Sequence, residues 1–331
     1  MSFKKLIPAQ LKSILKPWII PFQFLKVSAY DVYRFLRYSG IHWRTSKSEV
    51  SLGAQITKCY HIIEKGLALP EPRPGFGKEA IKNLCAQLEY AINNNICANE
   101  VTLAMDALHG YADFNAGSGI KASEHINRVL DLAERKGFNI TGKPVKEPER
   151  LSDVGTDYIK FITSRVSVRN FSNESVPEVV LENAVKAAQH APCVCNRQAG
   201  RIYLLRGEEE KHRALALQNG NRGFGSEASV IAIIAMDISE MLEPTERYQH
   251  WIDGGMFAQN FLLGIHAQGY GACPLNWSSS IGNDLKLRKL GYVKPEEVVI
   301  MMVAVGRLKG EYKVARSERK LLDNISHTIN K

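Results

Sequence analysis

Apolar side chains recur at helical spacing through the first half of the chain. The clearest stripe follows positions i, i+3, i+4, i+7 and i+11 and consists of Ile81, Leu84, Cys85, Leu88 and Ile92. This spacing predicts an amphipathic helix. A second helix is predicted over 124–136, because Gly137 suits its C-terminal stop. Residues 50 to about 140 are therefore predicted to be mainly helical, except for a loop at 69–77 with three prolines and two glycines.

Beyond about residue 150 the pattern changes to short apolar runs that alternate with helical stretches. The runs are partly β-branched, as is typical of strands buried on both faces, and span Arg201–Leu205, Ser229–Ala235 and Val298–Val305. One helix is predicted to begin at the capping pattern Ser175-Val-Pro-Glu178, and a longer one over Asp253–Gln268 is predicted to stop at Gly269. This alternation predicts an α+β fold.

The polar segment between the two patterns is the candidate linker. Residues 138–153 contain two prolines and a glycine and show no hydrophobic period. We therefore predict a mainly helical, basic region over 1–150 and an α+β domain over 151–331. A length of 331 residues permits two domains, and a composition of 45% hydrophobic and 23% charged residues excludes a disordered or collagen-like chain.

The cysteines argue against a disulfide-stapled or zinc-binding protein. No C-x-x-C pair occurs, and the six cysteines are scattered: Cys59, Cys85, Cys97, Cys193, Cys195 and Cys273. We predict a reducing compartment, hence a cytoplasmic protein, and no metal site.

Positive charge is concentrated at the N-terminus. Residues 1–50 hold nine Lys or Arg against Asp31 and Glu49, which gives +7 of the net charge of +9, and aromatic residues are interleaved with these charges. Such a segment can pack as an arm on its own protein or around a dimer partner, lie on an anionic membrane surface, or bind nucleic acid. We favour the arm, keep contact with the inner face of the membrane as the alternative, and expect no nucleic acid. The best apolar run, 18–25, is too short to span a membrane, and no signal-peptide cleavage site follows it.

Three separated segments carry basic or small polar groups that suit a phosphorylated ligand. In the first, Ser164-Arg-Val-Ser-Val-Arg-Asn-Phe171, the two arginines and the second serine alternate, so an extended backbone would point all three the same way. The second, Ala191-Pro-Cys-Val-Cys-Asn-Arg-Gln198, lies between a helix and a strand and could form a wall against a flat ligand. The third, Lys313-Val-Ala-Arg-Ser-Glu-Arg319, follows the last strand.

Each segment alone also has an ordinary interpretation. The first suits a solvated strand, the second a capped loop and the third a surface charge run. The C-x-C pair of the second segment offers only two metal ligands, so we favour small wall residues over a metal site or a redox-active pair of thiols.

Taken in order, these segments resemble the pattern of the nitroreductase superfamily of FMN-dependent oxidoreductases. That pattern is R-x-S-x-R-x-F, a helix ending in A-P-S-x-x-N-x-Q-P, a long helix that runs into G-x-G, and a final Ser-x-Arg. The corresponding stretches here are Arg165–Phe171, Ala191–Gln198, Asp253–Gln268 with Gly269-Tyr-Gly271, and Ser317–Arg319. The resemblance covers about residues 157–325 and implies a nitroreductase-like mixed sheet covered by helices.

The resemblance also implies how FMN would be held. Arg165 and Arg319 would bind the phosphate with Ser167 close by, and Arg316 is an alternative to Arg319. Arg169 would lie at the pyrimidine edge of the flavin.

Further positions would line the ring. Pro192 and Cys193 would lie against it, and Asn196 would contact the ring or the ribityl chain. The backbone of Gly271–Leu275 would approach flavin N5. Two more cofactor-binding candidates are Asn219 and Arg222. Cys193 stands where the family has serine, and Ala-Gly at 199–200 replaces proline and an aromatic residue, which predicts a more open substrate side.

The implied activity is ping-pong hydride transfer. NAD(P)H would bind transiently and reduce FMN at N5, and a small organic acceptor would then be reduced in its place. Arg169 and the backbone of Gly271 are the catalytic candidates, since Arg169 would offset negative charge on the flavin. The superfamily also contains dehalogenases and oxidases. A different class of function is an FMN-binding partner protein at a membrane or complex, with little turnover.

The resemblance further implies a homodimer with two flavin sites at the subunit interface. The long helix over 253–268 is expected to supply that interface, through Phe257, Phe261, Leu262 and Ile265.

Overall fold

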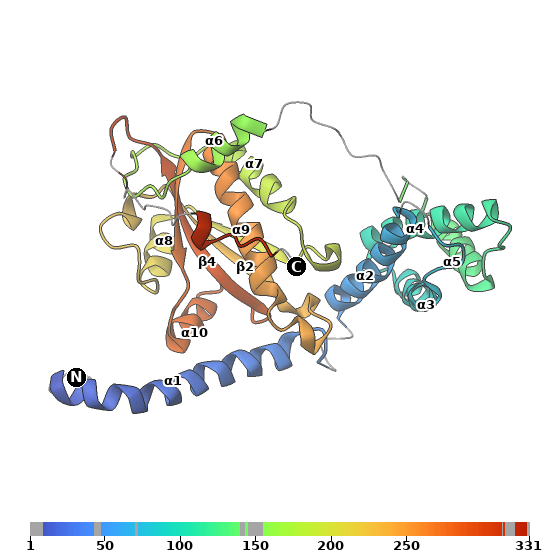
Figure 1. The fold of residues 1–331 in the computed structure, drawn as a ribbon, viewed down its shortest axis with the longest axis horizontal. Coiled ribbons are helices and arrows are strands. Elements are labelled where there is room, and N and C mark those ends of the chain that lie inside the picture. Colours follow the sequence, from blue (N-terminus) through green and yellow to red (C-terminus); the bar gives the residue numbers. More distant parts are fainter. Residues whose placement is uncertain are drawn as a thin grey trace.

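The first third of the chain is helical (Figure 1). The computed structural model describes residues 9–42, 48–69, 72–139, 143–144, 155–312, 314 and 322–329. Its first helices are α1 (Ala9–Tyr38), α2 (Glu49–Leu67), α3 (Lys78–Asn94), α4 (Ala98–Gly117) and α5 (Glu124–Arg135). Helices α2 to α5 enclose one apolar core, which contains the whole predicted stripe of residues 81–92. The prediction of a helical region is thus confirmed, and the described residues of the predicted loop, 72–77, are not helical.

Local capping chemistry sets several of these helix ends. The hydroxyl of Ser48 accepts a hydrogen bond from the backbone N–H of Ser51 at 3.2 Å, and that of Ser123 accepts from Ile126 at 3.4 Å. Gly137 follows α5 with a φ of 84°, a left-handed conformation that glycine adopts at little cost. The stop predicted there is confirmed.

The rest of the chain forms an antiparallel sheet with helices on both faces (Figure 1). The helices are α6 (Gly155–Ser164), α7 (Glu178–Gln189), α8 (Glu208–Leu215), α9 (Gln249–Ala267) and α10 (Ile281–Lys289). The strands are β1 (Gly200–Leu205), β2 (Val230–Asp237), β3 (Tyr270–Asn276) and β4 (Glu297–Arg307), in the order β1-β2-β4-β3. All three neighbouring pairs are antiparallel, and the parallel component of the expected mixed sheet is a bridge between Ser167 and Ala272. The α+β fold class is confirmed.

The two faces of the sheet bury different helices. On β2, Ala232 and Ile234 point toward α7 and α9, whereas Ile231 and Ile233 point into the core shared with α8 and α10. Every residue of β2 is buried, which explains its uninterrupted apolar run. The three predicted strands are confirmed.

Strand β3 was not predicted. Its sequence, YGACPLN, contains a glycine and a proline, which weaken the strand signal. Proline is tolerated because β3 is the last strand of the order β1-β2-β4-β3 and therefore lies at the edge of the sheet, paired with β4.

The predicted start of α7 is wrong. The N-cap is Pro177, with no side-chain cap bond, instead of Ser175. The backbone N–H of Val176 donates to the hydroxyl of Ser229 at 3.0 Å, so a contact with the β2 region orients the start of the helix.

The C-terminal half of α1 packs against the sheet domain. The guanidinium of Arg34 donates to the carbonyl oxygens of Pro295 and Glu297 at 2.9 and 2.7 Å, and the Tyr30 hydroxyl donates to Asp284 at 2.7 Å. Phe35 is buried in a small core at the end of β2. Tyr30, Arg34 and Phe35 thus pack on the protein itself, as expected if the N-terminal segment is an arm. No helix among the described residues is long and apolar enough to cross a membrane.

The helical region reaches the sheet domain through α2, which contacts the short turns at 194–196 and 238–240. In Figure 1, α3, α4 and α5 lie to one side of the sheet, and α2 stands between the two parts. The predicted boundary near residue 150 lies outside the described residues.

The residues expected at the dimer interface are already covered within one chain. Phe261, Leu262 and Ile265 are buried against α7 and the sheet, and Phe257 is half-buried beside Gly200. The prediction is wrong for Phe261, Leu262 and Ile265, which serve the core of their own domain, whereas Phe257 stays a candidate. The homodimer itself stays a prediction.

Candidate functional site

The first predicted segment runs along the outer edge of β3. Ser167 pairs with Ala272, and the backbone N–H of Val168 donates to the carbonyl of Ala272 at 3.0 Å. Val168 is buried in the core, whereas Ser167 and Arg165 are half-buried and Arg169 is exposed. The alternation read from the sequence therefore places Arg165, Ser167 and Arg169 on the open side of this segment.

Arg165 is half-buried and has one buried guanidinium nitrogen without a partner. Its Nη1 atom is buried without a hydrogen-bond partner, and no carboxylate of the described residues forms an ion pair with it. It borders a cavity of about 90 Å³ together with His266, Tyr270 and Tyr312. Burial, and next the charge of Arg165, lower the pKa of His266, so the imidazole does not add a second positive charge near neutral pH. A buried guanidinium N–H without a partner is suited to an anionic ligand.

Arg169 lies further along the same edge. Its guanidinium carbon is 6.0 Å from the ring centroid of Phe224, a cation–π distance. Phe224 follows the loop after α8 that contains Asn219 and Arg222, both exposed. Gln218 ties this loop to the end of β3 by donating to the carbonyl of Asn276 at 3.0 Å. The structure thus gathers the first segment, the 219–222 pair and β3 at one edge of the sheet.

Gly271, predicted to approach flavin N5, lies inside β3. It pairs with Gly306 of β4. A Cβ atom at this position would lie 2.9 Å from Leu308 and 3.1 Å from Val168, so glycine lets the 165–171 segment lie close to the strand.

The second predicted segment forms a strained turn before β1. Cys195, Asn196 and Gln198 have φ values of 50°, 53° and 56°, a region that costs non-glycine residues free energy and is concentrated at functional sites. Pro192 and Asn196 are exposed and Cys193 is half-buried. Burial raises the pKa of the Cys193 thiol, which favours a wall residue over a reactive thiolate.

An ion pair missed in the sequence holds this turn. Arg197 is buried and donates to the two carboxylate oxygens of Glu246 at 2.8 and 3.0 Å, and to the carbonyl of Glu240 at 2.7 Å. Burial would raise the pKa of Glu246, but its bonds from Arg197 and the backbone bring it below its usual value. The backbone N–H of Val194 donates to Asp253 at the start of α9. Arginine next to the asparagine was visible in the sequence, but its partner lies 49 residues away.

The two groups of predicted site residues lie far apart within one chain. The turn at 192–198 leads into β1, and the 165–171 segment flanks β3, so the strand order places them at opposite edges of the sheet, roughly 14 Å apart or more. Ser164 also bonds to His266 near the end of α9, while Val194 bonds to Asp253 near its start, about 20 Å away along the helix. One chain therefore does not bring the two groups together.

Arg316 and Arg319 of the third predicted segment lie outside the described residues. The structure therefore assigns no position to either arginine. Among the described residues no group of three or more His, Cys, Asp or Glu side chains could hold a metal ion.

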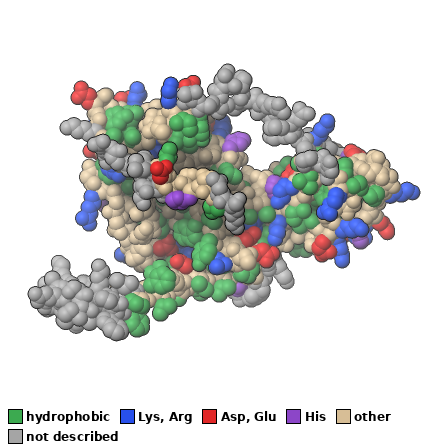
Figure 2. Space-filling model, in the orientation of Figure 1, with side chains coloured by type: hydrophobic (Ala, Val, Ile, Leu, Met, Phe, Trp, Pro, Cys, Tyr) green, Lys and Arg blue, Asp and Glu red, His purple; other side chains and the backbone are tan. Residues whose placement is uncertain are grey.

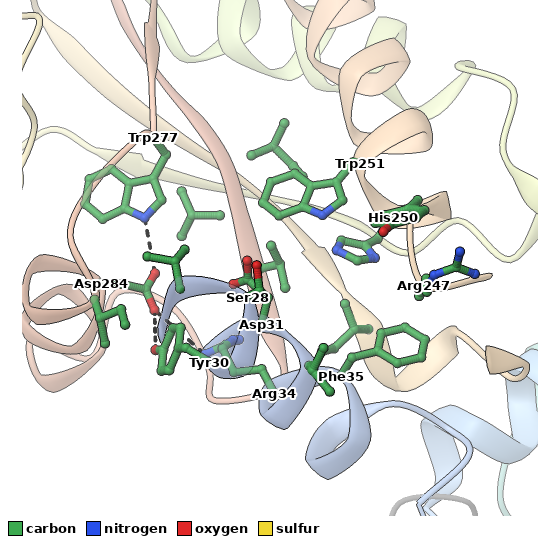
Figure 3. Close-up of a pocket in the computed structure, with 18 of the residues that line it drawn as sticks. Ser28, Tyr30, Asp31, Arg34, Phe35, Arg247, His250, Trp251, Trp277 and Asp284 are labelled. Carbon is green, nitrogen blue, oxygen red and sulfur yellow. Dashed lines mark hydrogen bonds and ion pairs between the residues drawn. The ribbon is translucent and has the colours of Figure 1, made fainter. Parts of the chain in front are cut away.

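A cavity of about 670 Å³ lies between α1 and the end of the sheet where β3 finishes (Figure 3). Trp251, Trp277, His250 and Phe35 supply its aromatic walls. Asp284 accepts hydrogen bonds from Tyr30 of α1 and, at 3.1 Å, from the indole of Trp277. The sequence did not predict this cavity, because α1, α9, α10 and three strand ends meet there only in the folded chain.

His250 is one of the buried polar residues that line this cavity, together with Arg34. Its side chain stacks on Phe35 with ring centroids 6.2 Å apart, and its Nδ1 atom is buried without a partner. Burial, with a contribution from Arg34, lowers the pKa of His250 to about 4. The imidazole is therefore neutral at pH 7.

We expect the low pKa of His250 to make the protein less stable in acid. Between pH 6.5 and 4 the unfolded chain holds a proton on this residue and the folded chain does not, so stability falls as the pH falls, by about 3 kcal/mol in all. His250→Phe keeps the stacking and removes the titration. Urea unfolding at pH 7 and pH 4 should show the stability of the wild type dropping relative to that of the variant. Equal pH dependence of the two proteins would contradict the assignment.

Comparison with known proteins places similarity in the sheet domain. Residues 162–221 and 210–307 match the model of the nitroreductase family. A Streptomyces coelicolor protein with the provisional name NADH dehydrogenase/NAD(P)H nitroreductase is 22% identical over 183 residues, 49% of this chain and 91% of that protein. A similarly named structure from Parabacteroides distasonis is 16% identical, with a TM-score of 0.46, and covers 52% of this chain and 98% of its own. A provisionally named nitroreductase from Desulfovibrio desulfuricans, solved in complex with FMN, is 21% identical, with a TM-score of 0.45. The match covers 52% of this chain and 97% of that protein.

Proposed function

Residues 162–307 of this chain belong to the nitroreductase family, and from this premise we propose that the protein is an FMN-dependent oxidoreductase that transfers hydride from NAD(P)H to a small organic acceptor. The observation that carries the proposal is the guanidinium of Arg165. It is held at the edge of β3 with a buried Nη1 that has no partner. Such a group is expensive to bury unless an anion completes its bonds, and a terminal phosphate does so with two oxygens at once.

FMN fits this edge better than FAD. The described arginines there, Arg165 and Arg169, lie four positions apart in extended backbone, about 13 Å, which suits one phosphate at one end and the flavin edge at the other. Ser167 lies between them and is half-buried. Arg319, or Arg316 in its place, would complete the phosphate site from the C-terminal segment.

When bound, FMN supplies the hydride chemistry at N5, so the chain needs no nucleophile of its own. The role of Arg169 would be electrostatic, because its fixed positive charge would stabilise negative charge at the pyrimidine edge of the flavin. Phe224 beneath the guanidinium limits its movement. The 271–275 backbone is held in β3 and would keep its position during turnover. We propose ping-pong turnover, with the acceptor taking the place of the nicotinamide.

We further propose that the site is completed by a second copy of the chain. Pro192, Cys193 and Asn196 stand at the opposite edge of the sheet from Arg165 and Arg169, which supports different flavins for the two groups within one chain. A homodimer would allow the turn of one chain to cover the flavin held by its partner. The exposed side of α9, with Trp251, Ile252 and Gly255, offers an apolar surface for such a contact.

The cavity between α1 and β3 is the proposed site of the acceptor. Its wall includes Asn276 and Trp277, which directly follow the 271–275 stretch. A volume of about 670 Å³ lies within the usual range of small-molecule sites. The two tryptophans, Trp251 and Trp277, suit a planar acceptor.

The purified protein is expected to be yellow and to release FMN, identified by mass, on denaturation. It should oxidise NADH or NADPH when a quinone or nitroarene is added. Steady-state rates with both nucleotides distinguish an oxidoreductase from an FMN-binding partner protein with little turnover. A colourless protein that takes up no added FMN would end the proposal.

A further inference from the structure

Helix α1 presents an apolar face to solvent. Phe22, Leu25, Val32, Tyr33 and Leu36 are 75%, 63%, 57%, 57% and 55% exposed. At 3.6 residues per turn their positions fall within an arc of about 100° on one side of the helix, whereas the exposed Phe24 and Val27 lie outside this arc. We call these five residues the α1 apolar face. Figure 2 shows hydrophobic side chains gathered along this part of α1.

This face cannot turn inward, because the other side of α1 is already anchored. Arg34 is bonded to two carbonyl oxygens at the start of β4, and Tyr30 is bonded to Asp284 of α10. Phe35, on the same side as these anchors, is buried in the core. The exposure of the apolar face is therefore fixed by the docking of the helix. A contiguous exposed apolar surface of this kind marks a binding surface in soluble proteins.

Positive charge accompanies the apolar face. Lys26 and Arg37 border its arc, and residues 1–50 carry nine Lys or Arg against two acidic residues. Two copies of this segment laid side by side would repel each other. An anionic bilayer, in contrast, would attract the positive charges to its headgroups and bury the apolar face near its acyl chains. The charge therefore favours a lipid surface over a second copy of the chain.

We propose that α1 lies in the headgroup region of an anionic bilayer, with the α1 apolar face toward the acyl chains and the bordering Lys26 and Arg37 near the lipid phosphates. This arrangement is that of an interfacial amphipathic helix. It places the sheet domain on the membrane surface, with the mouth of the α1 cavity beside the lipid, since Val32 and Leu36 belong both to the face and to the cavity wall. The inference does not depend on FMN.

Co-sedimentation of the full-length protein with vesicles tests the proposal. Binding is expected to phosphatidylcholine vesicles that contain phosphatidylglycerol, and to be several-fold weaker to pure phosphatidylcholine and at high salt. The double variant Phe22→Ser/Leu25→Ser should bind at least tenfold more weakly, because two exposed apolar side chains no longer enter the bilayer. Neither residue lines the cavity, so flavin content and NAD(P)H oxidation in solution should be unchanged.

The matched control is Tyr90→Ser/Leu103→Ser, which removes two exposed apolar side chains from α3 and α4. It should bind vesicles like the wild type. Equal binding by the Phe22/Leu25 variant and the wild type, or equal loss in the control, would overturn the proposal. A fall in sedimentation mass of the Phe22/Leu25 variant without vesicles would also overturn it, because the face would then be covered by a second copy.

Discussion

Replacing Arg165 by alanine should yield a folded protein that has lost most of its FMN. The guanidinium is the half-buried positive charge at the edge of β3, and its Nη1 atom has no partner among the described residues. Loss of a charge-assisted bond to phosphate costs about 1.5–3 kcal/mol, which corresponds to roughly ten- to hundredfold weaker binding. Folding should suffer little, since the variant removes an unsatisfied buried group.

Fluorescence titration of the apoprotein with FMN measures this effect, and thermal unfolding without FMN reports the fold. Arg135→Ala, on the exposed surface of α5, is the matched control and should leave both unchanged. If Arg165→Ala binds FMN as tightly as the wild type, Arg165 does not bind the phosphate. Arg319→Ala should weaken FMN binding in the same way. If Arg316→Ala loses the flavin and Arg319→Ala does not, Arg316 is the phosphate ligand.

A mixed dimer of two defective chains should recover FMN binding that neither defective homodimer has. One chain carries Arg165→Ala and the other Asn196→Gly, where glycine keeps the positive φ and removes the amide. If each site takes Arg165 from one chain and Asn196 from its partner, the mixed dimer has one intact site and one doubly defective site. It should therefore bind about half the FMN of the wild type.

Two affinity tags, one on each chain, isolate the mixed dimer for a stoichiometric FMN titration. The control is a mixed dimer of two Arg165→Ala chains with the same tags, in which both sites are defective. If Arg165 and Asn196 served the same flavin within one chain, each chain of the mixed dimer would have its own defect and no binding would return. That result, or a monomer with FMN bound, would reject the shared site.

Features that depend on neighbouring residues were predictable. The stripe over 81–92, the glycine stop at 137 and the three apolar strands needed only spacing and composition, and the structure confirms them. The R-x-S-x-R and P-x-x-x-N patterns likewise pointed to the segments that now stand at two edges of the sheet. Each of these features could be predicted because the residues that form it are close together in the chain.

Features that depend on distant partners were missed or misassigned. The stripe of α9 was expected to face a second subunit, but a stripe does not say which surface covers it, and the core of the same domain does. The start of α7 was assigned to Ser175, while a contact with Ser229 moves it to Pro177. Strand β3 was not predicted, because glycine and proline lower the strand propensity of its sequence. In the folded chain, pairing with β4 at the edge of the sheet offsets that low propensity.

The helical and α+β parts of the chain, the excess charge of the first 50 residues and the identity of the basic segments follow from the amino-acid sequence alone, because periodicity, composition and motifs are local properties. The folded chain was needed to find that Arg165 and Asn196 stand at opposite edges of the sheet, that Arg197 is held by Glu246, and that α1 borders a cavity while its apolar face stays outside. These outcomes follow from strand order and helix docking. Both are set by the summed free energy of contacts between residues far apart in the chain, which no local pattern records.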